Sequence, residues 1–132
     1  MSVDYSQLRP GQTVSNQACL LDVETVSRYV RAVQDRSALA APGSSYVPPM
    51  ALAALAVRGV VNDLQIPGGT LHLGQEIEFM EPVRVGESIN CSAELSQNSL
   101  RGGSRILVVA LSVTDAGGRT VMSGKATIAV PT

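Results

Sequence analysis

The sequence predicts an α+β fold in which a long, buried central helix is wrapped by a curved antiparallel sheet. One helix-like segment is apolar on every side until Arg58, and such a helix needs cover all round. Four strand-like segments then follow with no helix between them, a grouping that favours an antiparallel sheet. Aromatic residues make up only 3% of the 132 residues. The core must therefore be built from Val, Leu, Ile and Ala, which let a helix and a sheet approach closely.

A first strand and a first helix are expected at the start of the chain. Residues 11–21, GQTVSNQACLL, alternate loosely between apolar and polar side chains, as a strand does. Asp22 is a candidate N-cap, because its carboxylate can accept hydrogen bonds from the N–H groups one turn on. The apolar stripe of the helix that follows consists of Val23, Val26, Val30 and Val33. This helix should end near Asp35.

The second helix is the apolar one. A loop of Ala, Ser, Gly and Pro with one Tyr, residues 37–47, precedes it. Pro48 and Pro49 can open this helix, because proline has a helical φ and its missing N–H costs nothing in a first turn. The apolar pattern covers residues 50–64, and the IPGG sequence at 66–69 ends the helix.

The rest of the chain is strand-like. Four segments have the composition of strands, and they are residues 70–80, 88–97, 104–115 and 119–130. The turns between them are residues 81–87, 98–103 and 116–118. In the first of these strands, Ile77 and Phe79 share one face. The last two strands are expected to form a hairpin.

Length, charge and composition limit the classes of function. A chain of 132 residues is expected to form a single domain, residues 1–132. The formal net charge of −1, with Lys and Arg scattered, argues against nucleic acid and anionic membranes as partners. The start of the chain is polar, unlike a secretory signal, and the longest apolar run, residues 50–57, is too short to span a bilayer. We therefore expect a cytoplasmic protein that is not bound to a membrane.

The sequence predicts neither a metal nor a cofactor. Cys19 and Cys91 are isolated, with no CxxC or metal-like spacing, and are expected to be buried, reduced thiols. With one histidine in the chain, there is no Cys/His cluster to hold zinc. No Gly-rich phosphate loop follows a predicted strand.

The predicted order of elements suits the hot-dog fold, in which a curved sheet wraps a central helix. The sequence resembles the MaoC-like, or (R)-specific enoyl-thioester hydratase/dehydratase, family of hot-dog proteins. The resemblance lies in LRPGQTV (8–14), PPMALAAL (48–55), LHLGQEIEFMEPVRVGESI (71–89) and GRTVMSGKATIAVP (118–131). Its most specific part is GQEIEFMEPVRVGESI, in which Glu87 replaces the family's usual acid.

The resemblance implies hydration or dehydration at the β-carbon of an acyl-CoA or acyl-carrier-protein thioester, a lyase reaction of fatty acid metabolism. Family members carry an Asp and a His, five residues apart, after the first helix, one acting as base and the other as acid. A Gly N–H at the start of the buried helix polarises the thioester carbonyl. Here Asp35 takes the Asp position and Ala40 the His position. Pro49 takes the Gly position and has no N–H.

The catalytic candidates are therefore Asp35 and His72. Asp35 would lie near a helix C-terminus, where the helix dipole disfavours its charge. Alternatively, it is a solvated acid that pairs with Arg31 or Arg36. His72 could supply the missing acid from a neighbouring strand or subunit, or it is a half-buried structural residue.

Four further residues are candidates for substrate binding. Tyr46 could bond a substrate carbonyl or a water, and packing beside Pro48 is the alternative. Met50 and Ala51 could offer a backbone N–H in place of the family's Gly. Gln75 belongs to a family-like Gly-Gln pair, and bonding across the sheet is its alternative role.

Three arginines need a partner or solvent. Arg58, on the apolar helix, must extend outwards, pair with an acid such as Asp63, or lie at a subunit interface. Arg84 and Arg101 are candidates for contact with the phosphates of coenzyme A, although exposed arginines are usually only solvated.

Three functions are open. The chain is a dehydratase that uses Asp35 with a non-standard partner, or a non-catalytic subunit that helps a second hot-dog protein to bind the acyl chain. A hot-dog thioesterase ranks last, because residues 50–62 contain no carboxylate to activate water. The first two functions both predict a dimer, because hot-dog sheets continue edge to edge. It is a homodimer if the chain acts alone and a heterodimer if the chain is non-catalytic.

Overall fold

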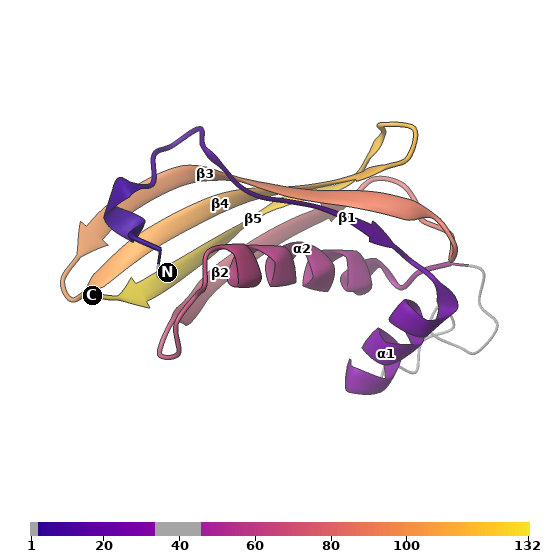
Figure 1. Cartoon of the computed structure of the whole chain (residues 1–132), viewed down its shortest axis with the longest axis horizontal. Coiled ribbons are helices and arrows are strands. Elements are labelled where there is room, and N and C mark those ends of the chain that lie inside the picture. Colours follow the sequence, from indigo (N-terminus) through magenta and orange to yellow (C-terminus); the bar gives the residue numbers. More distant parts are fainter. Residues whose placement is uncertain (1–2, 34–45) are drawn as a thin grey trace.

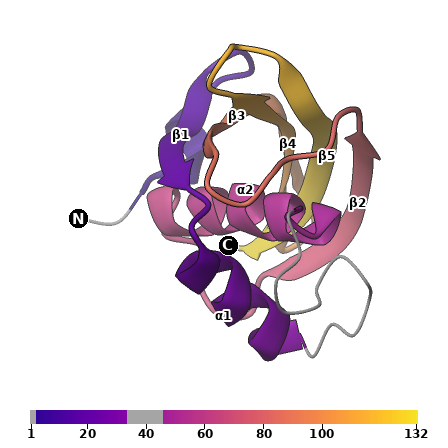
Figure 2. The same ribbon diagram turned by 90° about the vertical axis from the view of Figure 1, so that its right-hand side faces the viewer.

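In the described residues, 3–33 and 46–132, five antiparallel strands form one sheet that curls around helix α2 (Figures 1 and 2). The elements of this computed structural model are η1 (Tyr5–Gln7), β1 (Thr13–Leu20), α1 (Val23–Val33), α2 (Pro49–Asp63), β2 (Leu71–Phe79), β3 (Ser88–Arg101), β4 (Ser104–Asp115) and β5 (Thr120–Pro131). The predicted α+β class, with a curved antiparallel sheet around a central helix, is confirmed.

The strand order in the sheet is β1-β3-β4-β5-β2, so β1 and β2 form its two edges. Strands β3, β4 and β5 follow one another as antiparallel neighbours, and the β4–β5 pair is the predicted hairpin. Strand β2 pairs with β5, and β1 pairs with β3. Figure 2 shows the sheet curling from β1 round to β2, with α2 across its concave side. The two edge strands therefore flank the helix.

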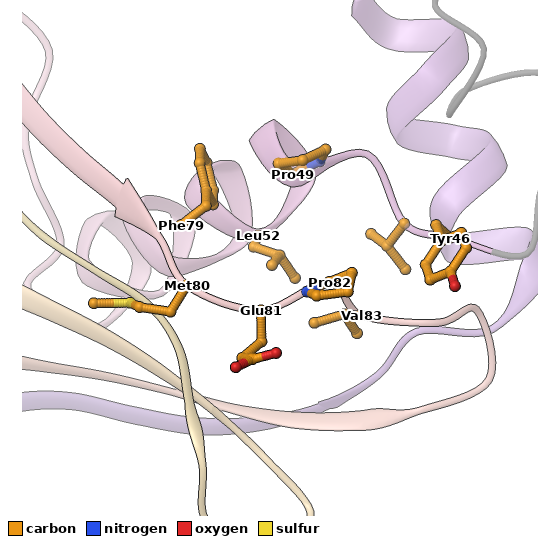
Figure 3. A pocket seen from close by; sticks show the side chains of 9 residues that line it. Tyr46, Pro49, Leu52, Phe79, Met80, Glu81, Pro82 and Val83 are labelled. Carbon is orange, nitrogen blue, oxygen red and sulfur yellow. The ribbon is translucent and has the colours of Figure 1, made fainter.

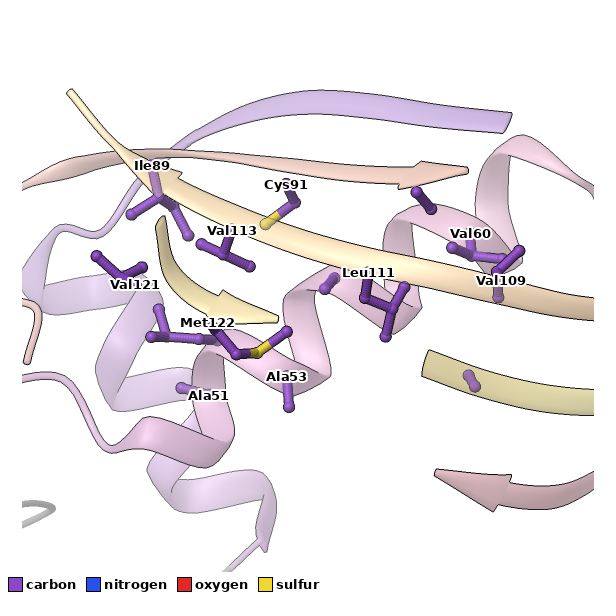
Figure 4. Close-up of a cluster of buried hydrophobic side chains, with 14 of the residues drawn as sticks. Ala51, Ala53, Val60, Ile89, Cys91, Val109, Leu111, Val113, Val121 and Met122 are labelled. Atoms are coloured by element: carbon purple, nitrogen blue, oxygen red, sulfur yellow. The ribbon is translucent and has the colours of Figure 1, made fainter. Parts of the chain in front are cut away.

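The core lies between α2 and the inner faces of β3, β4 and β5 (Figure 4). The buried residues of α2 are Ala51, Leu52, Ala53, Ala56, Gly59 and Val60. Fully buried strand residues that belong to the same core are Leu95, Leu107, Val113 and Met122. Most of the buried helix residues are Ala or Gly, so the helix can approach the sheet closely while larger strand side chains fill the space. The predicted aliphatic core is confirmed.

The opposite face of α2 is not covered by the sheet. Met50 is 51% exposed and Val61 is 43% exposed, and Ala54 and Arg58 between them are exposed as well. The expectation that the sheet covers this helix on all sides is therefore wrong for one face. A sheet that packs on one side of a helix leaves the far side open, and the apolar pattern cannot tell which face that will be.

A polar contact attaches the C-terminal part of α2 to β1. The Ser15 hydroxyl donates to Asp63 Oδ2 at 2.7 Å, and the Gln17 side-chain amide donates to Asp63 Oδ1 at 3.0 Å. Gly59 stands opposite Ser15, where an added Cβ would lie 3.0 Å from Ser15 Oγ. Both oxygens of Asp63 are thus engaged by β1. The alternative in which Arg58 pairs with Asp63 is wrong.

We expect Gly59→Leu to lower the free energy of unfolding by about 1–3 kcal/mol, the usual cost of overpacking a tight contact. The added side chain would collide with Ser15 and push β1 away from the helix. Urea unfolding followed by circular dichroism measures the loss. The matched control is Ala54→Leu, which enlarges an exposed residue of the same helix and should change stability by less than about 0.5 kcal/mol. Equal stabilities for the two variants would contradict this close approach.

Strand β3 is longer than the sequence predicts. It continues to Arg101, and the turn expected at 98–103 is reduced to Gly102-Gly103, where Gly102 has a φ of +57°. Asn98, a residue typical of turns, lies within the strand. Its side-chain amide donates to two backbone carbonyls of the N-terminal segment that includes η1, at 2.8 and 3.0 Å. A long-range partner has therefore decided the role of this asparagine.

The helices begin where the sequence predicts. Asp22 accepts a hydrogen bond from the Thr25 N–H at 2.8 Å, and bonding to Thr25 holds the pKa of the Asp22 carboxyl below its usual value. The expected end of the first helix, near Asp35, lies outside the described residues. Neither α1 nor α2, nor any other helix of the described ranges, has the length and hydrophobicity that a bilayer crossing requires.

Candidate functional site

The N-terminus of α2 supplies backbone N–H groups, because the first amides of a helix have no helical carbonyl before them. Pro49 is the first residue of α2, and a proline has no N–H. The N–H of Ala51 donates to the Pro48 carbonyl at 2.9 Å, and the Ala51 side chain is buried. Of the two backbone donors that the sequence predicts, Ala51 is therefore engaged locally. Met50 is left as the better candidate.

A groove of about 510 Å³ lies along the outer face of α2. Helix α2 supplies its floor, which includes Met50 and Arg58. Helix α1 contributes Tyr29, and strand β2 contributes His72 and Gln75. The fold thus brings three of the predicted site residues, Met50, His72 and Gln75, around one space.

His72 lies where this groove meets a second, apolar cavity. It lines both spaces, as do Val57 and Val61 of α2. His72 is exposed, so its alternative interpretation as a half-buried structural residue is wrong for this chain. An imidazole is the side chain best suited to exchange protons near neutral pH. His72 can therefore reach a substrate group that is bound where the groove and the cavity meet.

The apolar cavity has a volume of about 340 Å³ and lies between α2, the segment 66–70 and the sheet. Its aliphatic lining comes from Val57, Val60, Val61, Ile66, Val109, Leu111, Ala126 and Ile128. Burial of one CH₂ group in such a place is worth about 0.8 kcal/mol. The cavity can therefore hold an aliphatic chain.

Another pocket, of about 370 Å³, lies beside the start of α2 (Figure 3). It is lined by Tyr46, Pro49 and Leu52 together with the segment 79–83. In Figure 3 the Glu81 carboxylate points away from Pro49 and Leu52. Tyr46 therefore lines a different space from Met50, His72 and Gln75, and the predicted site residues fall into two groups.

Tyr46 is in contact with Arg84. Arg84 Nη2 donates to the Tyr46 hydroxyl at 3.3 Å, and the guanidinium carbon lies 5.1 Å from the centre of the Tyr46 ring. The two residues also form a backbone bridge. These contacts join Tyr46 to the loop that follows β2, and its packing beside Pro48 stays a prediction.

Metal ligands and thiols are the other reactive side chains to consider in the described part of the chain. Within residues 3–33 and 46–132, no three His, Cys, Asp or Glu side chains are grouped so that they could hold a metal ion. Both cysteines are free thiols, Cys91 buried and Cys19 partly buried. Burial raises the pKa of the Cys91 thiol to about 11, with a smaller contribution from Cys19. Cys91 is therefore protonated at neutral pH and acts as a core residue.

The two polar residues of the groove that were not among the predicted site residues are Tyr29 and Arg58. Nothing in the sequence marks Tyr29 as a site residue, because the first helix has both apolar and polar residues around it. The sequence does mark Arg58, since it is the lone charge in a long apolar segment. The pattern alone does not say what the Arg58 side chain faces. Asp35 and Ala40 lie outside the described residues, so the place of the predicted dyad stays a prediction.

Comparison with known families and structures adds to this geometry. The model of the family described as FAS1-like, dehydratase domain region matches residues 9–124. The unliganded R-hydratase from Pseudomonas aeruginosa is 21% identical, with a TM-score of 0.82 over 98% of this chain and 86% of that chain. The (R)-hydratase from A. caviae involved in PHA biosynthesis is 23% identical, with a TM-score of 0.74 over 95% and 98% of the two chains.

A chain from a protein complex is also similar. One chain of the C-terminally truncated 3R-hydroxyacyl-ACP dehydratase complex HadBC from Mycobacterium tuberculosis is 19% identical, with a TM-score of 0.66 over 90% of this chain and 98% of that chain. No curated protein matches the sequence. The likenesses confirm the predicted hot-dog fold and the predicted resemblance to (R)-specific hydratases and dehydratases.

Proposed function

Because this chain belongs to the FAS1-like, dehydratase domain region family, we propose that it binds an acyl thioester and adds or removes water at the β-carbon. The thioester is carried by coenzyme A or by a carrier protein. The observation that carries the proposal is the junction at His72, where the α2 groove meets the aliphatic cavity. Residues 1–132 act as a single domain in this proposal.

The aliphatic cavity is the proposed place for the acyl chain. Apart from His72, its lining has no ionisable side chain, and each CH₂ that enters it gains about 0.8 kcal/mol relative to water. With the acyl chain of the substrate in the cavity, the thioester group lies at the cavity mouth near His72. The groove then receives the part of the substrate beyond the sulfur, within reach of Gln75.

Asp35 and His72 share the proton transfers in the proposed reaction. In dehydration, one of them takes a proton from the α-carbon, and the C–H electron pair becomes the new double bond. The other gives a proton to the β-hydroxyl, which leaves as water. Hydration reverses both steps.

The open edge of β2 favours assembly with a second hot-dog chain. Leu71 is 62% exposed and Leu73 is 55% exposed on this edge strand. Edge strands with apolar side chains pair readily with another strand, and a two-fold axis satisfies both partners at once. We propose a homodimer formed through β2 if the chain is catalytic on its own.

A second candidate function is that of a non-catalytic partner in a heteromeric dehydratase. The observation in its favour is the start of α2, where Pro49 offers no N–H. The similarity to the HadBC dehydratase complex is compatible with it. A thioesterase is less favoured, because Asp63, the first acid along α2, is engaged by Ser15 and Gln17.

We expect the purified chain to hydrate crotonyl-CoA without another protein, because its own groove and cavity meet at His72. The decrease in absorbance of the enoyl thioester measures the rate. The same assay is repeated with any hot-dog protein encoded beside it. Turnover that requires this second protein would favour the non-catalytic subunit, and absence of turnover in both assays would contradict a role in hydration.

A further inference from the structure

Arg58 places a full positive charge in the groove. It lines the groove together with Tyr29, His72 and Gln75, and its side chain is exposed. Every other residue from 49 to 62 is uncharged. A cation in the middle of a helix interacts little with the helix dipole, which acts mainly at the last turn. The helix dipole therefore offers no stabilisation that would explain an arginine here.

No carboxylate in the described part of the chain pairs with Arg58. The ion pairs within residues 3–33 and 46–132 are Arg28–Glu24, Arg119–Asp115 and Lys125–Glu76. Asp63, one turn further along α2, binds Ser15 and Gln17 instead. With a formal net charge of −1, the chain is also not broadly basic. Arg58 is thus a local cation, set among apolar side chains and hydrogen-bonding groups.

We propose that Arg58 binds an anionic oxygen group of the substrate within this groove. The group is either a phosphate on the carrier or, on a short acyl part that stays outside the aliphatic cavity, a carboxylate. This inference rests on the proposed thioester function and narrows its substrate class. A guanidinium suits both groups, because two of its N–H donors can bond two oxygens at once. The Gln75 amide lines the same groove and can add a further hydrogen bond.

Binding of saturated thioesters tests the inference without any turnover, because these compounds have no double bond to hydrate. Isothermal titration calorimetry compares butyryl-N-acetylcysteamine, butyryl-CoA and the succinyl monothioester of N-acetylcysteamine. The first carries no anion, the second carries only phosphates, and the third carries only a carboxylate. The titrations use the full chain and its Arg58→Gln variant.

We expect Arg58→Gln to weaken binding of an anionic ligand about 10- to 100-fold, as the loss of a charge-assisted hydrogen bond does, and to leave the neutral ligand unchanged. A loss confined to butyryl-CoA identifies a phosphate, and a loss confined to the succinyl thioester identifies a carboxylate. Equal affinities of the two proteins for all three ligands would overturn the inference. An equal loss of affinity for all three ligands would also overturn it, as would a wild-type chain that binds no anionic thioester.

Arg9→Gln is the matched control, since it removes the same charge from an exposed residue outside the groove, and its affinities should equal those of the wild type. Sedimentation of each variant separates ligand binding from assembly. A change of oligomer size in Arg58→Gln with unchanged ligand binding would show that Arg58 pairs with another chain, and the inference would be wrong. If Arg58-dependent binding is found but crotonyl-CoA is not hydrated, only the proposed function fails.

Discussion

Replacing Asp35 by asparagine is expected to lower kcat for hydration of crotonyl-CoA by about 10²- to 10⁴-fold, the contribution of a positioned acid or base. Asparagine keeps the size of the side chain but cannot take up a proton, so proton transfer is lost while packing is preserved. Initial rates at saturating substrate give kcat, and the KM for crotonyl-CoA should change much less. This split between kcat and KM is the signature of a group that acts on the reacting atoms.

The control for this experiment is Glu24→Gln, which removes an exposed acid from α1 and should leave kcat unchanged. His72→Gln is measured beside it. If Asp35 and His72 act as one unit, the double variant should be no slower than the slower single variant. Full turnover by Asp35→Asn would show that this carboxylate is not the base, and turnover that depends on a second protein would then favour the non-catalytic subunit.

Leu95→Ala is expected to lower the free energy of unfolding by about 2–5 kcal/mol, the range for deletion of a fully buried leucine side chain. Leu95 is 0% exposed. Its backbone also receives a hydrogen bond from the Gly11 N–H at 2.8 Å and donates one to the Gln12 carbonyl at 2.9 Å. These bonds hold the N-terminal segment in place, so the surrounding structure has little freedom to collapse into the space. The loss is a large part of the 5–15 kcal/mol that is typical of a folded domain.

Leu100→Ala provides the matched control, because Leu100 lies on the same strand and is 61% exposed. The same chemical change should there alter the free energy of unfolding by less than about 0.5 kcal/mol. Urea unfolding of both variants, with equal slopes against denaturant, measures the difference. Similar losses at the two positions would mean that Leu95 does not lie in the hydrophobic core.

Sequence patterns predict helix starts and hairpins well, because these features depend on residues that are neighbours in the sequence. The Asp22 cap, the proline start of α2 and the β4–β5 hairpin each depend on neighbouring residues, and each is confirmed. The end of β3 was missed, because Asn98 and the residues after it have turn-like chemistry. Asn98 instead binds the backbone near η1, some ninety positions away, and no local pattern can report such a partner.

The candidate site was predictable only in part. The family resemblance indicates Met50 and Gln75, His72 is a candidate as the one histidine of the sequence, and the fold brings all three to one groove. Tyr46 was chosen with them but lines a separate pocket, because its loop pairs with Arg84 beyond β2. Which side of a helix or strand faces a shared space depends on how the sheet curls, and that is not encoded in any single segment.

By itself, the sequence determined the fold class, the order of the elements and the aliphatic core, because periodicity and composition act through neighbouring residues. The tertiary structure alone decided that one face of α2 is open, that Asp63 binds β1 and that Arg58 faces a groove with His72. These outcomes depend on how α2 packs against the sheet and on its contacts with β1, in which Ser15 and Gln17 lie 48 and 46 positions from Asp63. The direction of a charged side chain is set by such contacts and not by its neighbours along the chain.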